Sequence, residues 1–423
     1  MPPVCDVRSP DTAAVGSGRR IVVHDYAGHA FPVQLSRWLA ATGDTVLHLY
    51  SRDIETPRGR LGTRRDDPPG FTAEGLSIGR PLAKYALARR WLQEMEYGTR
   101  LSRRVAAFRP EVVLSANAPP AVQARLHGAL RRAGLPLVCW VQDLYFLGAR
   151  ELLKTKPPPF RWAALRFLER VELAPMRGAA GLVVITGDFL PILAARGVRV
   201  PRTAVIENWA PRPEIPVLPK DNAWARAHGL ADRFVFLYSG TLGLKHNPTY
   251  LASLARAFRD QPQVRVVVVS QGLGRSRLES VKAAEGLDNL LLLDFQPFEQ
   301  LPEVLASADV AVLLLEAFAG VLSVPSKVYS YACAERPVLA AVPAVNLARR
   351  LVETEDIGLC VNPADEAGFI AAARSLFADA TLRAACAANQ AAYAARAFDI
   401  HRIGARFRFV LDEACGAGKS SGR

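Results

Sequence analysis

The sequence lacks any long uninterrupted run of apolar residues. None of its hydrophobic stretches approaches the roughly 20 residues that a membrane-spanning helix needs. Residues 1–20 also lack the apolar core of a secretory signal peptide. We therefore expect a cytoplasmic protein. Residues 1–18 are polar and rich in small side chains, a composition typical of disorder.

Cysteine is also scarce. The six cysteines stand at positions 5, 139, 333, 360, 386 and 415, and none of them shows the CxxC or similar spacing of a zinc site or redox motif. The pattern indicates isolated thiols in a reducing compartment and excludes a disulfide scaffold.

Acidic residues are outnumbered by basic ones. The chain has 40 Asp and Glu against 53 Lys and Arg, a formal charge of +13, and its pI is about 9.8. Such an excess indicates an anionic partner: nucleic acid, an acidic membrane surface or a phosphorylated ligand. We expect no nucleic-acid partner, because the chain has no recognition motif and no aromatic platform of the kind that binds nucleic acid.

A chain of 423 residues suits two domains of about 200 residues each. In both halves short apolar runs alternate with helical patterns, as at residues 20–24 and 45–50 and again at residues 234–238 and 264–270. This alternation predicts two α/β domains with parallel, doubly wound sheets. The proline-rich segment Ala210–Pro219 is the predicted linker.

The most informative stretch is Phe234–Leu251, FVFLYSGTLGLKHNPTYL. It begins as a buried strand, turns at two glycines, and continues through Lys245 to Asn247 and Pro248, which are typical of a helix start. Glycines let the backbone approach a ligand, and a lysine beside a helix start favours an anion, so we interpret the stretch as a phosphate site. An ordinary strand-to-helix turn with a surface lysine fits the same residues.

A second cationic helix start lies in the same half, within Ala319–Pro343. There Pro325, Ser326 and Lys327 precede a short predicted helix, and Arg336 precedes another strand. A second lysine at a helix start can hold a diphosphate from its other side.

These motifs resemble a known family. YSGTLGLKHNP, VPSKVYSYACAERPVLAAVP and the early segment DYAGHAFPVQLSRWLA, in this spacing, are similar to bacterial glycosyltransferases of family 4, especially the branch of exopolysaccharide and O-antigen synthesis that includes colanic acid. The resemblance implies an α/β GT-B fold, with two Rossmann-like domains facing a central cleft. Residues 19–212, completed by a helix over 397–414, would bind the acceptor, residues 213–396 the nucleotide sugar, and residues 415–423 would be a flexible tail.

The resemblance also implies a donor site. Gly240, Thr241 and Lys245 would hold the phosphates, and Lys245 and Lys327 would neutralise the leaving diphosphate. The other matching positions are Gln296 at the base, Glu316, Gly320 and Ser323 in the loop facing the diphosphate and sugar, and Ser326 at the second helix start.

The chain departs from the family at its paired glutamates, where it has Leu322 and Ser330. Ser330 can offer one hydrogen bond to the ribose, and Glu316 stands at the wrong spacing to replace the missing carboxylate. Serine recurs at this position in the polysaccharide branch, so the resemblance implies a subfamily trait. Many relatives have arginine in place of Thr241, so Lys245 would carry more of the charge here.

On the acceptor side, Gly28 and His29 lie where the family keeps glycines close to the transferred sugar. The family's histidine–aspartate pair reads Gln142–Asp143 here. His29 and Asp143 are therefore the candidate catalytic bases. Asp143 can instead cap the next segment, His29 can order its loop, and in retaining transferases the leaving diphosphate can itself accept the proton.

Two segments of the first half, residues 80–109 and 160–177, combine arginines with tryptophan and leucine. They are typical of helices that lie on an anionic membrane, and equally of helices that pack on their own sheet, with Leu87, Trp91 and Met95 as the apolar stripe of the first.

We therefore expect a retaining glycosyltransferase, peripheral on the inner face of the plasma membrane. It would move a sugar from a UDP- or GDP-sugar to a lipid-diphosphate-linked saccharide, with no metal or other cofactor. A nucleotide-sugar epimerase of the same fold is the alternative. Product analysis without an acceptor distinguishes the two.

Overall fold

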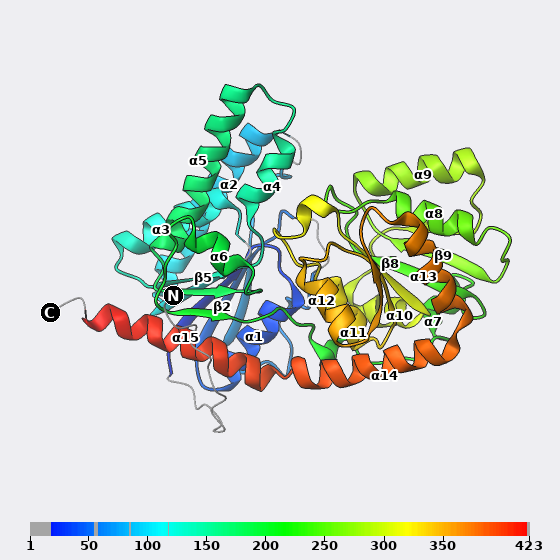
Figure 1. Cartoon of the computed structure of the whole chain (residues 1–423). Coiled ribbons are helices and arrows are strands. Elements are labelled where there is room, and N and C mark those ends of the chain that lie inside the picture. Colours follow the sequence, from blue (N-terminus) through cyan, green and yellow to red (C-terminus); the bar gives the residue numbers. More distant parts are fainter. Residues whose placement is uncertain (1–17, 55–57, 84–85, 117, 421–423) are drawn as a thin grey trace. The chain divides into compact units, whose positions relative to one another are not determined.

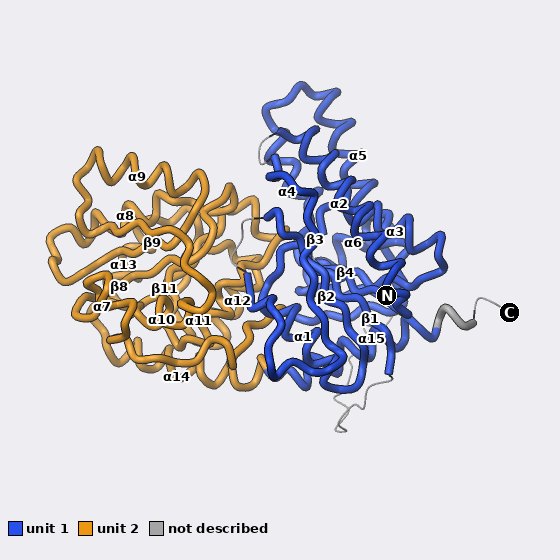
Figure 2. The backbone as a smooth tube through the Cα atoms, turned by 180° about the vertical axis from the view of Figure 1, so that it is seen from behind, with its two compact units in different colours: residues 1–207, 399–423 blue, residues 208–398 orange. Residues whose placement is uncertain are grey.

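The computed structural model describes residues 18–54, 58–83, 86–116 and 118–420. They form two compact units, residues 1–207 with 399–423 and residues 208–398 (Figure 2). The domain boundaries expected from the sequence, at residues 212 and 396, lie close to these. The predicted disorder of residues 1–18 falls almost wholly outside the described residues.

Unit 1 contains a parallel sheet in the order β3-β2-β1-β4-β5-β6-β7 (Figure 1). Its strands are β1 Arg20–Asp25, β2 Thr45–Ser51, β3 Phe71–Leu76, β4 Val112–Ala116, β5 Leu137–Val141, β6 Gly181–Val184 and β7 Thr203–Val205. β1 and β4 to β6 are wholly buried apart from Arg20, as expected of strands covered on both faces.

The helices of unit 1 lie on the two faces of this sheet. They are α1 Ala30–Ala41, α2 Leu87–Phe108, α3 Pro120–Arg132, α4 Tyr145–Leu152, α5 Pro158–Arg177, α6 Phe189–Ala194 and α15 Ile400–Ser420. α15 returns after unit 2 and packs on α1 and on β4 to β6. Its Arg408 forms an ion pair of 2.7 Å with the buried Asp44, which fixes the returning helix to this unit. Because α15 continues to Ser420, residues 415–420 are helical, and the tail predicted from residue 415 is wrong for them.

Unit 2 has a parallel sheet in the order β10-β9-β8-β11-β12-β13. Its strands are β8 Phe234–Ser239, β9 Val264–Val269, β10 Leu290–Leu293, β11 Val310–Leu314, β12 Val338–Ala341 and β13 Gly358–Val361. Its helices are α7 Ala223–Ala227, α8 Thr249–Ala257, α9 Leu273–Glu285, α10 Leu301–Ala306, α11 Lys327–Cys333, α12 Leu347–Thr354, α13 Glu366–Ala378 and α14 Ala380–Ala397, with short 3-10 turns at Arg212–Glu214, Phe298–Gln300 and Ala317–Ala319.

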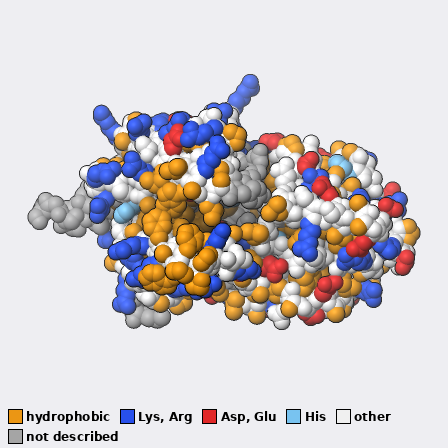
Figure 3. Space-filling view, turned by 90° about the horizontal axis from the view of Figure 1, so that it is seen from above, with side chains coloured by type: hydrophobic (Ala, Val, Ile, Leu, Met, Phe, Trp, Pro, Cys, Tyr) orange, Lys and Arg blue, Asp and Glu red, His pale blue; other side chains and the backbone are white. Residues whose placement is uncertain are grey.

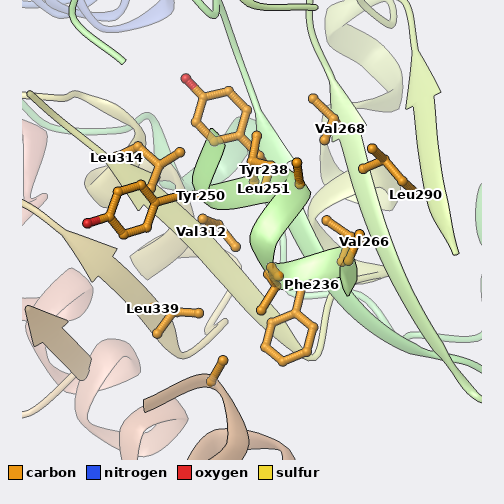
Figure 4. Packing of buried hydrophobic residues seen from close by; sticks show 14 of the residues in the cluster. Phe236, Tyr238, Tyr250, Leu251, Val266, Val268, Leu290, Val312, Leu314 and Leu339 are labelled. Atoms are coloured by element: carbon orange, nitrogen blue, oxygen red, sulfur yellow. The ribbon is translucent and has the colours of Figure 1, made fainter. Parts of the chain in front are cut away.

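The core of unit 2 forms where β8, β9 and β11 meet α8 (Figure 4). Phe236 and Tyr238 of β8 are fully buried against Leu251, Val266 and other aliphatic side chains of this cluster. The apolar run that predicts a buried strand is therefore the centre of the unit. The chain immediately after this strand is held in place by that packing.

A further sequence expectation was wrong. The apolar stripe predicted for residues 80–109 is not the buried face of α2: Leu87 is exposed, and the fully buried apolar residues are Tyr97, Leu101 and Val105.

Candidate active site

The candidate residues follow the carboxyl ends of strands in the two sheets, most of them beside the point where the strand order reverses. In unit 2 the reversal falls between β8 and β11, and in unit 1 between β1 and β4. Helices leave opposite faces of the sheet on either side of such a point, so a crevice opens there, and open α/β sheets bind their ligands in it.

In unit 2, Tyr331 of α11 bridges the two strands at this point. β8 and β11 pair only at Phe236–Val310 and Leu237–Ala311. Further along, the Tyr331 hydroxyl accepts a hydrogen bond from the Ser239 amide, at 3.3 Å, and donates one to the Val312 carbonyl, at 3.2 Å. A side chain thus satisfies the backbone groups that the parted strands leave unpaired.

The turn after β8 is fixed by hydrogen bonds. The Tyr238 hydroxyl donates to the Thr241 carbonyl at 2.9 Å, and the Leu242 amide donates to Ser270 Oγ at 3.0 Å. Gly240 has φ of 131°, a conformation that favours glycine. The glycine turn is therefore preformed, as a phosphate-binding loop requires.

His246 closes the same turn and adds no charge to it. The Gly243 amide donates to His246 Nδ1 at 3.2 Å, so this nitrogen carries the lone pair. Burial, and then the charges of Lys327 and Lys245, hold the pKa of His246 well below its usual value. His246 is therefore neutral. Of His246, Lys245 and Lys327, only the two lysines bring positive charge to the turn.

Lys327, the first residue of α11, reaches back over the turn. A Cβ atom added at Gly240 would lie 2.3 Å from Lys327 Cε and 3.0 Å from Nζ. The ammonium also lies 5.0 Å from the centre of the Tyr238 ring. Burial, and then the charge of Lys245, lower the pKa of Lys327 to about 8. The positive charges of the two lysines therefore act on each other, as expected of a site built for a bound anion.

Lys245 connects the β8 turn to the loop after β11. Its ammonium donates to the buried Ser323 Oγ at 2.8 Å, and its carbonyl accepts from the Glu316 amide at 2.8 Å. Asn346 fixes the same loop, because its Nδ2 donates hydrogen bonds to the carbonyls of Gly320 and Ser323 at 2.7 and 2.8 Å. The structure thus brings together two motifs whose contacting residues, Lys245 and Ser323, are 78 positions apart in the sequence.

The other predicted donor residues lie as follows. Thr241 and Ser326 are exposed, and Ser326 precedes α11 without a side-chain cap. Ser330 stands three residues after Lys327, on the same face of α11. Gln296 has both ends of its amide engaged: Oε1 accepts from Trp224 Nε1 at 3.2 Å, and Nε2 donates to the Asp294 carbonyl at 2.9 Å.

In unit 1 the acceptor-side candidates follow β1. Gly28 has φ of 76°, and a Cβ atom there would lie 2.8 Å from Leu61 Cδ1. Asp25, fully buried at the end of β1, accepts a hydrogen bond from the His29 amide and lies 3.4 Å from His29 Nδ1. Burial opposes protonation of His29, but the Asp25 carboxylate outweighs it, and Asp143 adds to the effect, so the pKa of His29 is raised.

Asp143 follows β5 and lines a small pocket with Ser115, Gln123, Gln142 and Glu172. Glu172 of α5 is buried, and its two oxygens accept hydrogen bonds from the amides of Tyr145 and Phe146 at 2.8 and 2.6 Å. It therefore caps α4, the role that the sequence left open for Asp143. Burial raises the pKa of Glu172 to about 8, against the effect of the two amides.

Sequence reasoning missed several residues that organise these sites. They are Asp25, Glu172, Ser270, Tyr331 and Asn346. The residue type can indicate a role, as an asparagine before a helix does at Asn346, but the partner of each side chain does not follow from the sequence. Within the described residues no group of three or more His, Cys, Asp or Glu side chains is placed to hold a metal ion.

Comparison with known proteins decides the family. Residues 29–209 match the family model described as glycosyl transferase 4-like domain, and residues 221–393 match that of glycosyl transferases group 1. The chain belongs to the glycosyltransferases of family 4. The Escherichia coli K12 protein WcaI, named as a colanic acid biosynthesis glycosyl transferase, is 28% identical over 141 residues. These make up 33% of this chain and 34% of WcaI, so the match spans about a third of that protein.

Solved structures of this glycosyltransferase's fold confirm the expected GT-B architecture. Sucrose-phosphate synthase from Thermosynechococcus elongatus has a TM-score of 0.70 at 17% identity, covering 94% of this chain and 100% of that one. Anabaena HepE in complex with UDP-glucose has a TM-score of 0.68 at 16% identity, covering 93% and 99%. WaaG, a glycosyltransferase involved in lipopolysaccharide biosynthesis, has a TM-score of 0.67 at 15% identity, covering 92% of this chain and 99% of that one.

Proposed function

We propose that this glycosyltransferase moves a sugar from a UDP- or GDP-sugar to a lipid-diphosphate-linked saccharide in bacterial cell-surface polysaccharide synthesis, with retention of configuration. The observation that carries the proposal is the convergence of Lys245 and Lys327 on the turn at Gly240. The names of WcaI and WaaG support the polysaccharide role, and the UDP-glucose in HepE supports a nucleotide-sugar donor.

The two lysines would act on the leaving group. Breaking the bond between the sugar and the diphosphate leaves a nucleoside diphosphate with one more negative charge. Cations already in place at that position lower the barrier, because they need not reorganise during the reaction. Since a bound anion favours the charged form of Lys327, donor binding would also restore its lowered pKa.

The acceptor hydroxyl must lose a proton. His29, oriented by Asp25, and Asp143 are the side chains of unit 1 proposed for this role, with the leaving diphosphate as the other acceptor of the proton. A lipid-linked acceptor places the reaction at a membrane, and we propose the cytoplasmic face of the plasma membrane. We propose no metal, so transfer should persist in EDTA.

Calorimetric titration with UDP tests the donor site. Lys245→Ala removes a charged contact to the ligand, for which a loss of about 1.5–3 kcal/mol is typical, and should weaken UDP binding by roughly ten- to a hundredfold. Lys282→Ala, on α9 of the same unit, is the matched control and should leave the affinity unchanged. Unchanged affinity in Lys245→Ala would remove the central claim.

A panel of nucleotide sugars, with release of UDP or GDP as the readout, identifies the donor. Addition of extracted bacterial lipid-linked saccharides should stimulate release. The epimerase alternative finds no support in the comparisons. Formation of a free epimer without acceptor would nevertheless contradict transfer.

A further inference from the structure

Unit 1 carries a cluster of exposed large apolar side chains at one end of three helices. We call this cluster the apolar tip; it consists of Leu87 and Leu92 of α2, Leu152 of α4, and Phe160, Trp162 and Phe167 of α5. Each is more than half exposed, and Leu92 and Trp162 reach 68%. Soluble proteins rarely expose such a set together unless it binds something.

The tip is a surface and not a loosely packed core. α2 and α5 are linked there by the rings of Trp91 and Phe167, whose centres lie 5.4 Å apart. The buried residues of α5 begin only at Glu172 and Leu173, and those of α2 at Gln93. The sheet-facing parts of both helices are therefore distinct from the tip, which projects beyond the sheet of unit 1 (Figure 1).

Basic side chains surround the tip. Figure 3 looks down on this end and shows a broad apolar area with Lys and Arg around it. Arg89, Arg166 and Arg170 are exposed or partly exposed there, and they form no ion pair with any residue that the structure describes. The nearby carboxylates are neutralised: Glu151 pairs with Lys154, and Glu169 with Arg196 at 3.0 Å.

We propose that the apolar tip docks this protein on an anionic lipid bilayer, with Trp162 and Phe160 inserted into the interface and the arginines on the headgroups. Tryptophan and arginine are the side chains that suit this boundary, and anionic lipids attract basic residues beside it. A projecting surface can enter a bilayer, which deforms to receive it. The inference goes beyond the proposed transfer, and vesicles without acceptor test it separately.

Quenching by brominated lipids gives the sharpest test. Trp162 is the most exposed of the six tryptophans; Trp38, Trp140, Trp209 and Trp224 are buried, and Trp91 is partly buried. Vesicles of phosphatidylglycerol and phosphatidylethanolamine with bromines on the acyl chains should quench the wild-type fluorescence. Trp162→Phe should abolish most of the quenching and still bind. Binding without quenching of the wild type would overturn insertion.

Co-sedimentation with unbrominated vesicles measures the affinity. Phe160→Ser with Trp162→Ser should lower the partition coefficient about tenfold or more, since two apolar anchors are lost. Leu273→Ser, an equally exposed leucine on α9 of unit 2, is the matched control and should change nothing. Unaltered UDP affinity and circular dichroism in the variants show that they are folded.

The charges are tested in the same assay. Arg166→Glu with Arg170→Glu should release the protein at physiological salt, and Arg277→Glu on α9 should not. Neutral phosphatidylcholine vesicles should bind the wild type about tenfold more weakly or worse. The proposal is overturned if the wild type does not bind anionic vesicles, if both double variants bind as well as it does, or if the tip instead mediates a dimer that Trp162→Ser disrupts in sedimentation velocity.

Discussion

The side chain of Lys327 passes so close to Gly240 that only a glycine, which has no Cβ atom, fits at position 240. A methyl group on Gly240 would lie 2.3 Å from Lys327 Cε, closer than the 3.0 Å that real contacts essentially never fall below, and φ of 131° is itself unfavourable for any residue with a side chain. The glycine is therefore what lets the second lysine reach the turn that holds the first. The two motifs of the donor site depend on each other at this contact.

Gly240→Ala should weaken UDP binding about tenfold or more, because the added methyl group displaces Lys327 from the turn. It should also lower the free energy of unfolding by about 1–3 kcal/mol through backbone strain. Calorimetry and urea denaturation measure the two effects. Gly243→Ala is the matched control, since the nearest atom to its added methyl group is Thr241 Cγ2 at 4.0 Å. Equal affinities in the two variants would contradict the role of Gly240.

The affinity for UDP should fall as the pH rises through about 8. The lowered pKa of Lys327 means that its ammonium form, which attracts the diphosphate, is present below that pH and lost above it. Binding favours the charged form, so it should take up a proton near pH 8, which calorimetry in buffers of different ionisation enthalpy detects. Lys327→Arg keeps its charge and should flatten the pH dependence. An identical fall in that variant would assign the effect to another group.

His24, His29 and His48 should titrate differently from one another. Burial lowers the pKa of His24 to about 3 and that of His48 to about 4, so neither should titrate between pH 5.5 and 8. His29 should titrate above its usual 6.5, because Asp25 stabilises its charged form. NMR of ring-labelled histidine measures this, with His29→Gln for assignment.

The same pair links stability to pH. Because the folded pKa of His29 is raised, its contribution to the free energy of unfolding is complete below the unfolded pKa near 6.5 and is lost as the pH rises through the folded value. Asp25→Asn should lower the pKa of His29 and remove this dependence. A His29 resonance that does not move in Asp25→Asn would show that the carboxylate is not its partner.

Ser330→Glu should strengthen UDP binding about tenfold if Ser330 faces the ribose, because a carboxylate accepts hydrogen bonds from both ribose hydroxyls. Its position on the Lys327 face of α11 motivates the change. Titration with 2′,3′-dideoxy-UDP separates this effect from attraction between the new carboxylate and Lys327, since that analogue should gain nothing. Equal gains for both ligands would place Ser330 away from the ribose.

The local geometry of the proposed donor site could be predicted where its signals are local. An apolar run, two glycines, Lys245 and Asn247 occupy consecutive positions, and Asn247 does accept from the Thr249 amide at the start of α8. The meeting of Lys245 with Ser323 depends instead on β8 and β11 being neighbours in the sheet, which the family resemblance supplied and the residues alone do not.

Other features depend on partners far along the chain. Glu172 caps α4 because α5 folds back on it, 27 residues away. Asp25 contacts His29 only four residues on, but it is buried there because β1 lies between β2 and β4 in the sheet. β3 was missed because FTAEGL has no apolar run or alternation; it pairs at the sheet edge, where one neighbour suffices. In α2 the predicted apolar stripe and the buried stripe differ by part of a helical turn, which composition does not resolve.

Glu172 and Trp162 stand on the same helix, ten residues apart. At 1.5 Å per residue, about 15 Å of helix separates Glu172, which caps the start of α4 beside Asp143, from Trp162. With Trp162 inserted in the bilayer, α5 would act as a spacer of fixed length between the bilayer and the pocket that Asp143 lines. Only an acceptor whose diphosphate and sugars together span that distance could place its terminal hydroxyl in this pocket. The length of one helix would therefore select acceptors by size, in addition to any selection by side-chain contacts.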